Sequence, residues 1–194
     1  MLDLKGCVLT ADALNCQKTV AAKALKKKAD YLLALKGNHP VFLKRCTHIM
    51  DALSNRSSPG FEQVRKDPGR IETRRCWQSH FVDWYADRAQ WPGLRSFVLI
   101  ESTRECGDSI KTNRRYYISS LPQRESYAAK SARVHWQIEN SLHWRLDVVF
   151  NEDQSRALAR NAPKNLSTLR SICLNLLRRV PGKSSLRASG SRYR

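Results

Sequence analysis

The N-terminal part of the chain alternates between short apolar runs and one amphipathic segment, and this pattern constrains the fold more than any other feature. Residues 6–11 form a short apolar run with β-branched members, typical of a buried strand, which ends at Asp12. Residues 15–29 have apolar side chains at helical spacing and lysines toward their end, which predicts a helix. Residues 30–35 form a second apolar run. A strand, a helix and a strand in this order predict a βαβ unit with two parallel strands.

The middle of the chain changes to the period of strands. Residues 41–53 predict another helix, and the polar residues 54–67, which include Ser-Ser-Pro-Gly, predict a loop. From Gly69 to Pro122 short strand-like segments alternate with turn signals, so we expect an antiparallel block. The strand-like segments are residues 71–77, 97–103 and 115–120.

Helical spacing returns in the C-terminal part. Apolar residues from Val134 to Leu146 repeat every four positions, inside a helix that we expect from residue 126 to about residue 150. A second helix is expected from Pro163, which suits a first helical position, to about Arg179. These patterns predict an α/β fold with four parts. The parts are residues 1–53, a β-rich segment at 54–125, a helical segment at 126–180 and a basic tail at 181–194, which we expect to be disordered.

The charge of the chain indicates a polyanionic partner. Lys and Arg number 35 against 17 Asp and Glu, which gives a formal net charge of +18. After Asp153 the sequence contains ten Lys or Arg and no acidic residue. A surface of this kind attracts nucleic acid by releasing counterions. A ribosome-like or merely soluble basic protein is the alternative.

The composition excludes several other classes of protein. No run of 18 apolar residues is present and the N-terminus lacks a signal-peptide pattern, so we expect a cytoplasmic protein without a membrane partner. The six cysteines lack the close pairing of a zinc knuckle and are expected to be free thiols.

Two acidic residues stand at positions that could carry metal chemistry. Asp12 is expected at the carboxyl end of a parallel strand, where α/β sheets place ligands, but it could equally cap the following helix. Glu139 lies within a helical stripe with His135, His143 and Asp147 at four-residue spacing. That stripe could be a hydrogen-bonded structural seam, a metal site with neighbours that touch DNA, or a zinc site.

The segment from Gly69 to Arg75 alternates charged residues with Ile and Thr. Alternation places Arg70, Glu72 and Arg74 on one face of a strand. This face could follow a phosphate backbone, or it could be an exposed face held by cross-strand ion pairs.

Several long segments resemble the H-repeat-associated transposases of bacteria, which are insertion-sequence enzymes of the DDE type. The resemblance covers nearly the whole chain up to about Arg179, in the order of the family, and is densest around Glu139. The matching segments are residues 4–18, 30–38, 69–75, 115–121, 135–148, 150–156, 161–163 and 165–166.

The resemblance implies a ribonuclease-H-like core, partial in this chain, with a β-rich insertion before the last catalytic helix. Such enzymes use two Asp and one Glu to hold two Mg²⁺ ions, or Mn²⁺, for cutting and joining DNA. The match implies Asp12 as the second Asp and Glu139 as the Glu, both catalytic and metal-binding. The implied partners are duplex DNA at insertion-sequence ends and targets and, as a further candidate, a second copy of the chain. The residues expected to contact DNA are Arg70, Arg74, His135, Trp136 and Arg145.

The first catalytic Asp of the family lies on a strand upstream of the segment that matches Asp12. Only eleven residues precede Asp12 here, and they form its own strand. We therefore expect a truncated copy that does not transpose DNA alone. Two alternatives stay open, namely a non-catalytic DNA-binding protein derived from a transposase and a zinc hydrolase that uses His135 and His143.

Overall fold

The computed structural model describes residues 3–83, 85–138, 146, 150–151, 154–157 and 159–179. It divides into two compact units, Met1–His135 and Trp136–Arg194, and each is described by itself below. The elements of the first unit, with α3 ending three residues beyond it, are β1 (Val8–Ala11), the 3₁₀ helix η1 (Ala13–Asn15), α1 (Lys18–Lys26), β2 (Asp30–Leu35), α2 (Pro40–Arg56), β3 (Phe61–Asp67), β4 (Arg70–Ser79), the 3₁₀ helix η2 (Ala86–Gln90), β5 (Ser96–Cys106), β6 (Ser109–Ser119) and α3 (Glu125–Ile138).

The six strands form one mixed sheet in the order β1-β2-β6-β5-β4-β3. β1 pairs with β2 in parallel, which confirms the predicted βαβ unit, and the other pairs are antiparallel, which confirms the predicted antiparallel block. The chain is therefore a mixed α/β protein. The sheet runs through both residues 1–53 and residues 54–125, and the predicted domain boundaries stay predictions.

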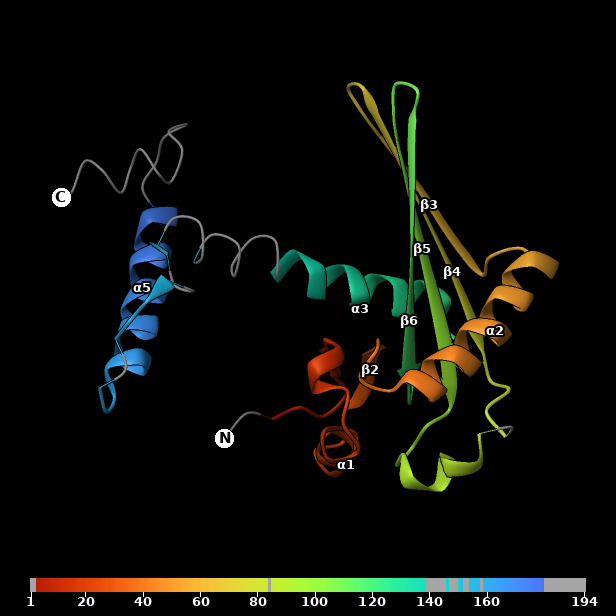
Figure 1. Ribbon diagram of the computed structural model, residues 1–194, viewed down its shortest axis with the longest axis horizontal. Helices are drawn as coiled ribbons and strands as arrows, with labels where there is room; N and C mark the ends of the chain where they lie inside the picture. Colours follow the sequence, from red (N-terminus) through yellow and green to blue (C-terminus); the bar gives the residue numbers. More distant parts are fainter. Residues whose placement is uncertain are drawn as a thin grey trace. The chain divides into compact units, whose positions relative to one another are not determined.

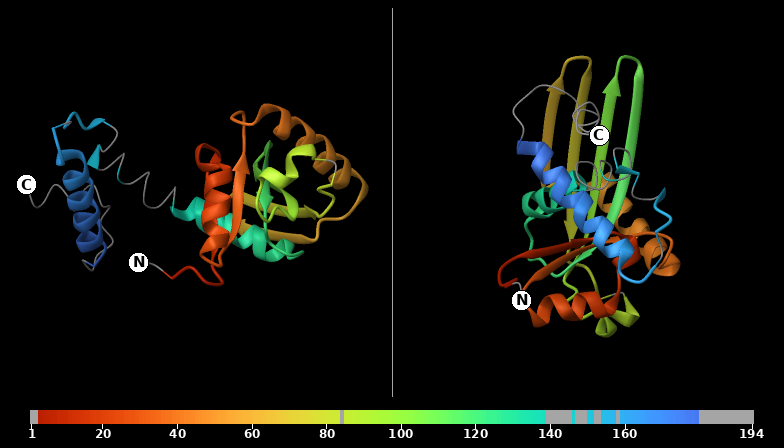
Figure 2. Two further views of the ribbon diagram at one scale, coloured as in Figure 1. Left: turned by 90° about the horizontal axis from the view of Figure 1, so that it is seen from below. Right: turned by 90° about the vertical axis from the view of Figure 1, so that its left-hand side faces the viewer.

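Helices cover the two faces of the sheet, as Figure 2 shows. On one face α1 and α2 pack with η2 against the inner parts of the strands, around buried side chains such as Phe42, Met50, Phe97 and Leu99. On the other face α3 packs through Ala128 and Ala132. We call these faces the α2 side and the α3 side.

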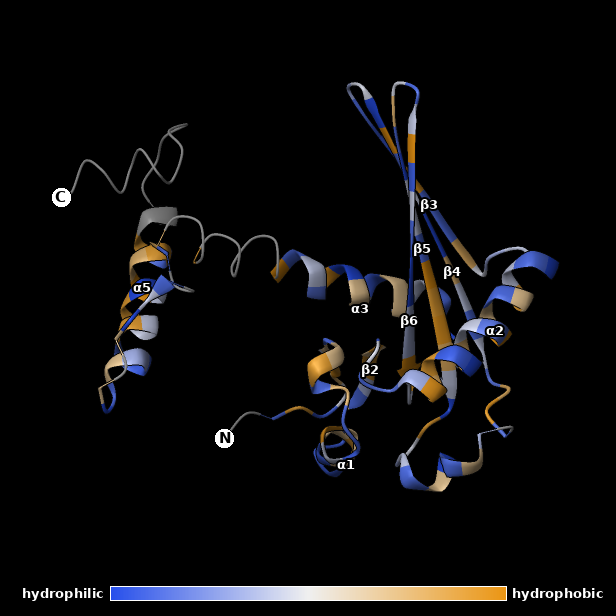
Figure 3. Ribbon diagram, viewed as in Figure 1, coloured by the Kyte–Doolittle hydropathy of each residue, from blue (hydrophilic) through white to orange (hydrophobic). Residues whose placement is uncertain are grey.

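The outer parts of β3, β4, β5 and β6 extend beyond the helices and form a four-stranded arm (Figure 1). We define the arm as residues 62–75 and 101–115. Two tight turns close it, with Gly69 and Gly107 at positive φ of 70° and 56°. Hydrophobic side chains concentrate in the inner part of β5, and the arm is mostly hydrophilic (Figure 3). The hydrophobic core therefore ends where the arm begins.

Two sequence predictions about this unit are wrong. Residues 54–67 do not form only a loop, since β3 occupies Phe61–Asp67 at the sheet edge. Its side chains are mostly exposed, so no apolar alternation marks it, and the strand is held by backbone pairing with β4. The bounds expected for the first helix, residues 15–29, are also wrong, because α1 spans only Lys18–Lys26 and the 3₁₀ helix η1 precedes it.

In the second unit the helix α5 spans Ala162–Arg179, close to the predicted range. Leu174 is buried, whereas Leu169, Ile172 and Leu176 are about half exposed. In the described part of the chain, no helix combines the length and the apolar character that crossing a membrane requires.

Candidate functional site

Asp12 directly follows β1, as the sequence predicts, and it also caps η1. Its Oδ1 accepts hydrogen bonds from the backbone nitrogen of Asn15 at 3.2 Å and from Asn15 Nδ2 at 2.9 Å. The side chain is exposed to solvent. The strand-end position and the capping role are therefore both present at the same residue.

His135 of α3 lies against Thr10 of β1. Thr10 Oγ1 and His135 Nδ1 are 3.4 Å apart, although 125 positions separate the two residues. Thr10 precedes Asp12 by two positions in the sequence, and His135 precedes Glu139 by four. This contact brings the segment before Asp12 and the segment before Glu139 together on the α3 side of the sheet.

A buried glutamine fixes the start of α3. Gln78 Nε2 donates to Ser96 Oγ at 2.9 Å and to the Pro122 carbonyl at 3.1 Å, and Gln78 Oε1 accepts from the backbone nitrogen of Arg124 at 2.9 Å. Gln78 lies on β4, and Arg124 directly precedes α3. The direction in which α3 leaves the sheet is thus set by a side chain that is almost fully buried.

Several predicted site residues lie outside the described part of the chain. Glu139, His143 and Arg145 belong to residues 139–145, of which the structure describes none, and Trp136 begins the second unit. Among the described residues, no group of three or more His, Cys, Asp or Glu comes together as a metal site would need. The zinc hypothesis rests partly on His143 and stays a prediction.

The oxygen donors around Asp12 fit a hard divalent cation. Its carboxylate is exposed, Thr10 on the preceding strand β1 carries a hydroxyl, and Mg²⁺ is usually held by one or two carboxylates together with water and phosphate oxygens. The bond to Asn15 engages one carboxylate oxygen only. Capping and metal binding by Asp12 are therefore compatible.

The predicted DNA-contacting arginines Arg70 and Arg74 lie on β4, within the arm. Arg70 pairs with Asp67 at 3.1 Å, and Arg74 pairs with Glu72 at 2.6 Å. Arg70 also has a buried Nε without a hydrogen-bond partner among the described residues. Both arginines are thus held in place by acids on the same face of the arm.

Ion pairs connect all four strands of the arm on the α2 side and reach α2. Arg75 lies between Glu62 at 3.0 Å and Glu101 at 3.6 Å, and Arg114 lies between Glu101 at 2.8 Å and Asp51 at 3.1 Å. This row, the ion-pair ladder, consists of Glu62, Arg75, Glu101, Arg114 and Asp51. It fastens the base of the arm to α2.

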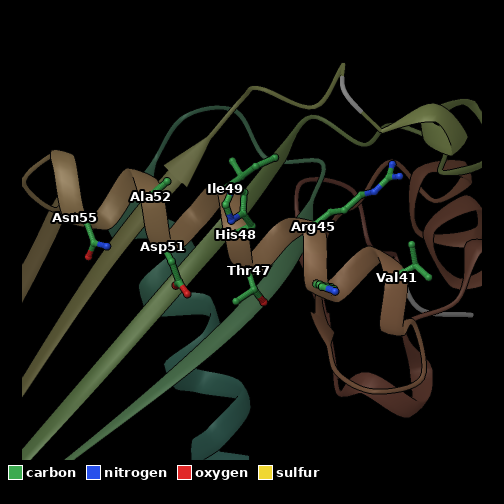
Figure 4. A pocket seen from close by; sticks show the side chains of 9 residues that line it. Val41, Arg45, Thr47, His48, Ile49, Asp51, Ala52 and Asn55 are labelled. Carbon is green, nitrogen blue, oxygen red and sulfur yellow. The ribbon is translucent and has the colours of Figure 1, made fainter.

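Asp51 also lines a broad surface depression along α2, with a volume of about 1110 Å³ (Figure 4). The Tyr116 hydroxyl donates to Asp51 at 2.7 Å, and burial, followed by this hydrogen bond, raises the pKa of Tyr116 to about 12. The lining includes apolar side chains of Val41, Ile49 and Ala52. Asp51, the acid in this depression, is thus engaged by both Arg114 and Tyr116.

Sequence reasoning did not identify Thr10 as the partner of His135, and it did not identify the edge strand β3 of the arm. Thr10 has no distinctive motif. The Pro68-Gly69 and Gly107-Asp108 pairs, however, are two-residue turn signals that could have revealed both hairpins and their register. That register would have placed Arg104 opposite Lys111.

Comparisons with known proteins give the class of the chain. Residues 1–176 match the family described as the transposase DDE domain. The chain is 39% identical over 186 residues to putative transposase YncI of Escherichia coli O157:H7, which covers 92% of this chain and 47% of that protein. It is 36% identical over 184 residues to the H repeat-associated putative transposase YhhI of Escherichia coli strain K12, and this match covers 91% of this chain and 49% of that protein.

The chain belongs to the family of transposases with a DDE domain. More particularly, its similarity to the H repeat-associated relatives confirms the branch that the sequence predicts. The chain spans about half the length of these curated relatives.

Proposed function

We infer that the chain takes part in DNA transposition by binding duplex DNA and holding a divalent metal with Asp12 and Glu139. The family implies DNA as the substrate and a divalent metal in its reaction. The observation that carries the proposal is the contact between Thr10 and His135, because it joins the two segments that lead to the proposed carboxylates. We further propose a ribonuclease-H-like core and action in the cytoplasm.

In this proposal each residue has a defined role. Asp12 and Glu139 would supply oxygen ligands to Mg²⁺ or Mn²⁺, which when bound polarises the phosphate and activates water or a DNA 3′-hydroxyl. Thr10 orients His135, so that its ring faces the same strand end. Arg70 and Arg74 would contact DNA, together with His135, Trp136 and Arg145.

The chain by itself is expected not to complete strand transfer, because the resemblance assigns only two of three carboxylates to its positions. Glu72 is no substitute for the third. Across the sheet, Glu72 is in register with Lys111 of β6. Ala11, which directly precedes Asp12, is in register with Leu33 and with Ile118 of β6, and Ile118 lies seven residues along β6 from Lys111. That separation is roughly 23 Å along the strand, too far to share one metal. Asp147 is the next acid to test.

A non-catalytic DNA-binding protein is the second candidate, since the described residues contain no group of three or more His, Cys, Asp or Glu that could hold a metal. Mn²⁺ binding measured in the presence of duplex DNA separates the two functions. The proposal predicts binding that Asp12→Asn and Glu139→Gln each weaken at least tenfold, while Asp108→Asn at an arm turn does not. Equal binding by all four proteins would support the non-catalytic candidate.

Strand transfer with the ends of the cognate element and Mg²⁺ or Mn²⁺ is the second test. We expect no product from the chain alone. Robust product that disappears in Asp12→Ala would contradict the missing carboxylate, and it would direct attention to Asp147.

A further inference from the structure

Strand register divides the side chains of the arm into two faces. Directly opposed residues of antiparallel strands share a face, and successive residues alternate between faces. The pairing of β3, β4, β5 and β6 continues without a bulge from the core to both turns. Arg74 therefore shares the α3 side with Cys76 of the core beneath α3, and Arg75 shares the α2 side with Trp77.

Charge is segregated between these faces. The α2 side of the arm has as many basic as acidic residues, whereas basic residues outnumber acids on the α3 side three to one. The α3 side carries Arg65, Arg70, Arg74, Arg104, Lys111 and Arg115 against Asp67 and Glu72, and the α2 side carries Lys66, Arg75 and Arg114 against Glu62, Glu101 and Glu105.

The basic excess on the α3 side is not neutralised within the arm. Asp67 pairs with both Arg65 and Arg70, and Glu72 pairs with Arg74. Arg104 and Lys111 are exposed and directly opposite each other, and neither has an ion pair with a described residue. Like charges opposed across two strands destabilise a sheet. An external polyanion would remove that repulsion.

We propose that the α3 side of the arm is a binding surface for the phosphate backbone of duplex DNA, and that the α2 side is not. The inference rests on the proposed function and names the surface that would hold its DNA. The α3 side is also the side on which Thr10 meets His135. DNA on this surface would therefore lie on the same side of the sheet as the contact between Thr10 and His135.

The dimensions of the arm favour phosphates over base edges as its targets. Side chains of one face repeat every ~6.6 Å along a strand and every ~4.8 Å across strands, which gives a grid of cations. Four strands span about 14 Å between the outer backbones. A two-stranded ribbon fits the major groove, which is about 12 Å wide, but a four-stranded sheet is too broad. The surface should thus bind DNA with little sequence preference.

Two exposed lysines near the turns give a matched test. Lys111 lies on the α3 side and Lys66 on the α2 side, and neither has an ion pair with a described residue. The full chain and the variants Lys111→Gln, Lys66→Gln and Arg104→Gln/Lys111→Gln are titrated with random-sequence duplex DNA at several salt concentrations. Circular dichroism and urea unfolding establish that all variants fold as the wild type does.

Each lost phosphate contact lowers the slope of log affinity against log salt by about 0.9, which is about eightfold in affinity at 0.1 M salt. We expect this loss for Lys111→Gln, twice this slope change for the double variant, and no slope change for Lys66→Gln. Equal losses for Lys111→Gln and Lys66→Gln would overturn the inference and leave DNA binding intact. A wild-type chain without salt-dependent binding would overturn the proposed function as well.

Discussion

The inner and outer parts of the same strands differ in almost every physical respect. The inner part of β5 is buried on both faces beneath α2 and α3, and its outer part reaches solvent on both sides. Hydrophobic burial holds the inner part, whereas backbone pairing and the ion-pair ladder hold the arm. The comparison shows that a strand can keep its register after its core has ended. Its exposed side chains are then available for charge and for binding.

The largest difference between the two parts should appear when an aliphatic side chain is truncated. Leu99 in the inner part of β5 is fully buried, and Ile110 in the arm is 67% exposed. Leu99→Ala should lower the free energy of unfolding by about 2–5 kcal/mol, since it loses buried surface and leaves a cavity. Ile110→Ala should change it by less than about 0.5 kcal/mol. Urea unfolding followed by circular dichroism measures both, and similar losses would contradict the division.

Two glutamines of the β3–β4 hairpin give the next largest contrast. Gln78 makes buried hydrogen bonds at the start of α3, whereas Gln63 is exposed in the arm. Gln78→Ala should destabilise the fold by about 1–3 kcal/mol, because it leaves buried polar groups without partners. Gln63→Ala should be near neutral. Faster hydrogen exchange at the start of α3 in Gln78→Ala alone would support the anchoring role, and unchanged exchange would oppose it.

Two cysteines sharpen the comparison through pH. Burial, and to a lesser degree the charge of Glu125, raises the pKa of the Cys76 thiol to about 12, while Cys106 beside the outer turn is exposed. The folded-state pKa of Cys76 lies above the unfolded value of about 9, so the thiol ionises more readily in the unfolded chain. The contribution of the neutral thiol to the stability of the folded state is therefore complete below pH ~9 and is lost as the pH rises to about 12.

Relative to Cys76→Val, the wild type should therefore lose about 1 kcal/mol of unfolding free energy between pH 9 and pH 10. Cys106→Ser, at an exposed position in the arm, is the matched control. Unfolding in urea at a series of pH values measures the three proteins. Parallel curves for the wild type and Cys76→Val would show that Cys76 is solvated.

The smallest effect concerns the ion-pair ladder. Glu101 bridges Arg75 and Arg114, whereas Glu105 lies further out on the same face of β5 without an ion pair among the described residues. Glu101→Gln should cost about 1 kcal/mol at low salt, and less at high salt, because partly exposed pairs are screened. Glu105→Gln should cost almost nothing. A salt-independent loss in Glu101→Gln would point to packing and not to charge.

Much of the inner part could be predicted from the sequence, because buried strands and helices require apolar side chains at regular spacings. The run at residues 30–35 gave β2 with its observed bounds, and the antiparallel block was expected from apolar segments such as 97–103. The outer edge could not be predicted in the same way. β3 is held by its neighbour's backbone and shows no apolar alternation.

The candidate site likewise has one part that the sequence predicts and one part that it does not. Asp12 was placed at a strand end because a buried strand precedes it, and the structure agrees. The contact of Thr10 with His135 joins residues 125 positions apart, and no local pattern encodes such a pairing. The ion-pair ladder depends equally on register, which turn residues alone could have indicated.

The convergence of Asp12 and Glu139 is the central claim and can be measured directly by cross-linking. The cysteine pair Asp12→Cys/Glu139→Cys would be treated with a short bis-maleimide in a background with Cys7, Cys106 and Cys173 changed to serine, since Cys16, Cys46 and Cys76 are buried. Asp108→Cys/Glu139→Cys is the control, because Asp108 lies ten residues along β6 from the row beside Asp12, roughly 30 Å away. We predict rapid intramolecular cross-linking of the first pair only. Failure of that pair to cross-link, or equal cross-linking of the control, would contradict a shared metal site at the end of β1.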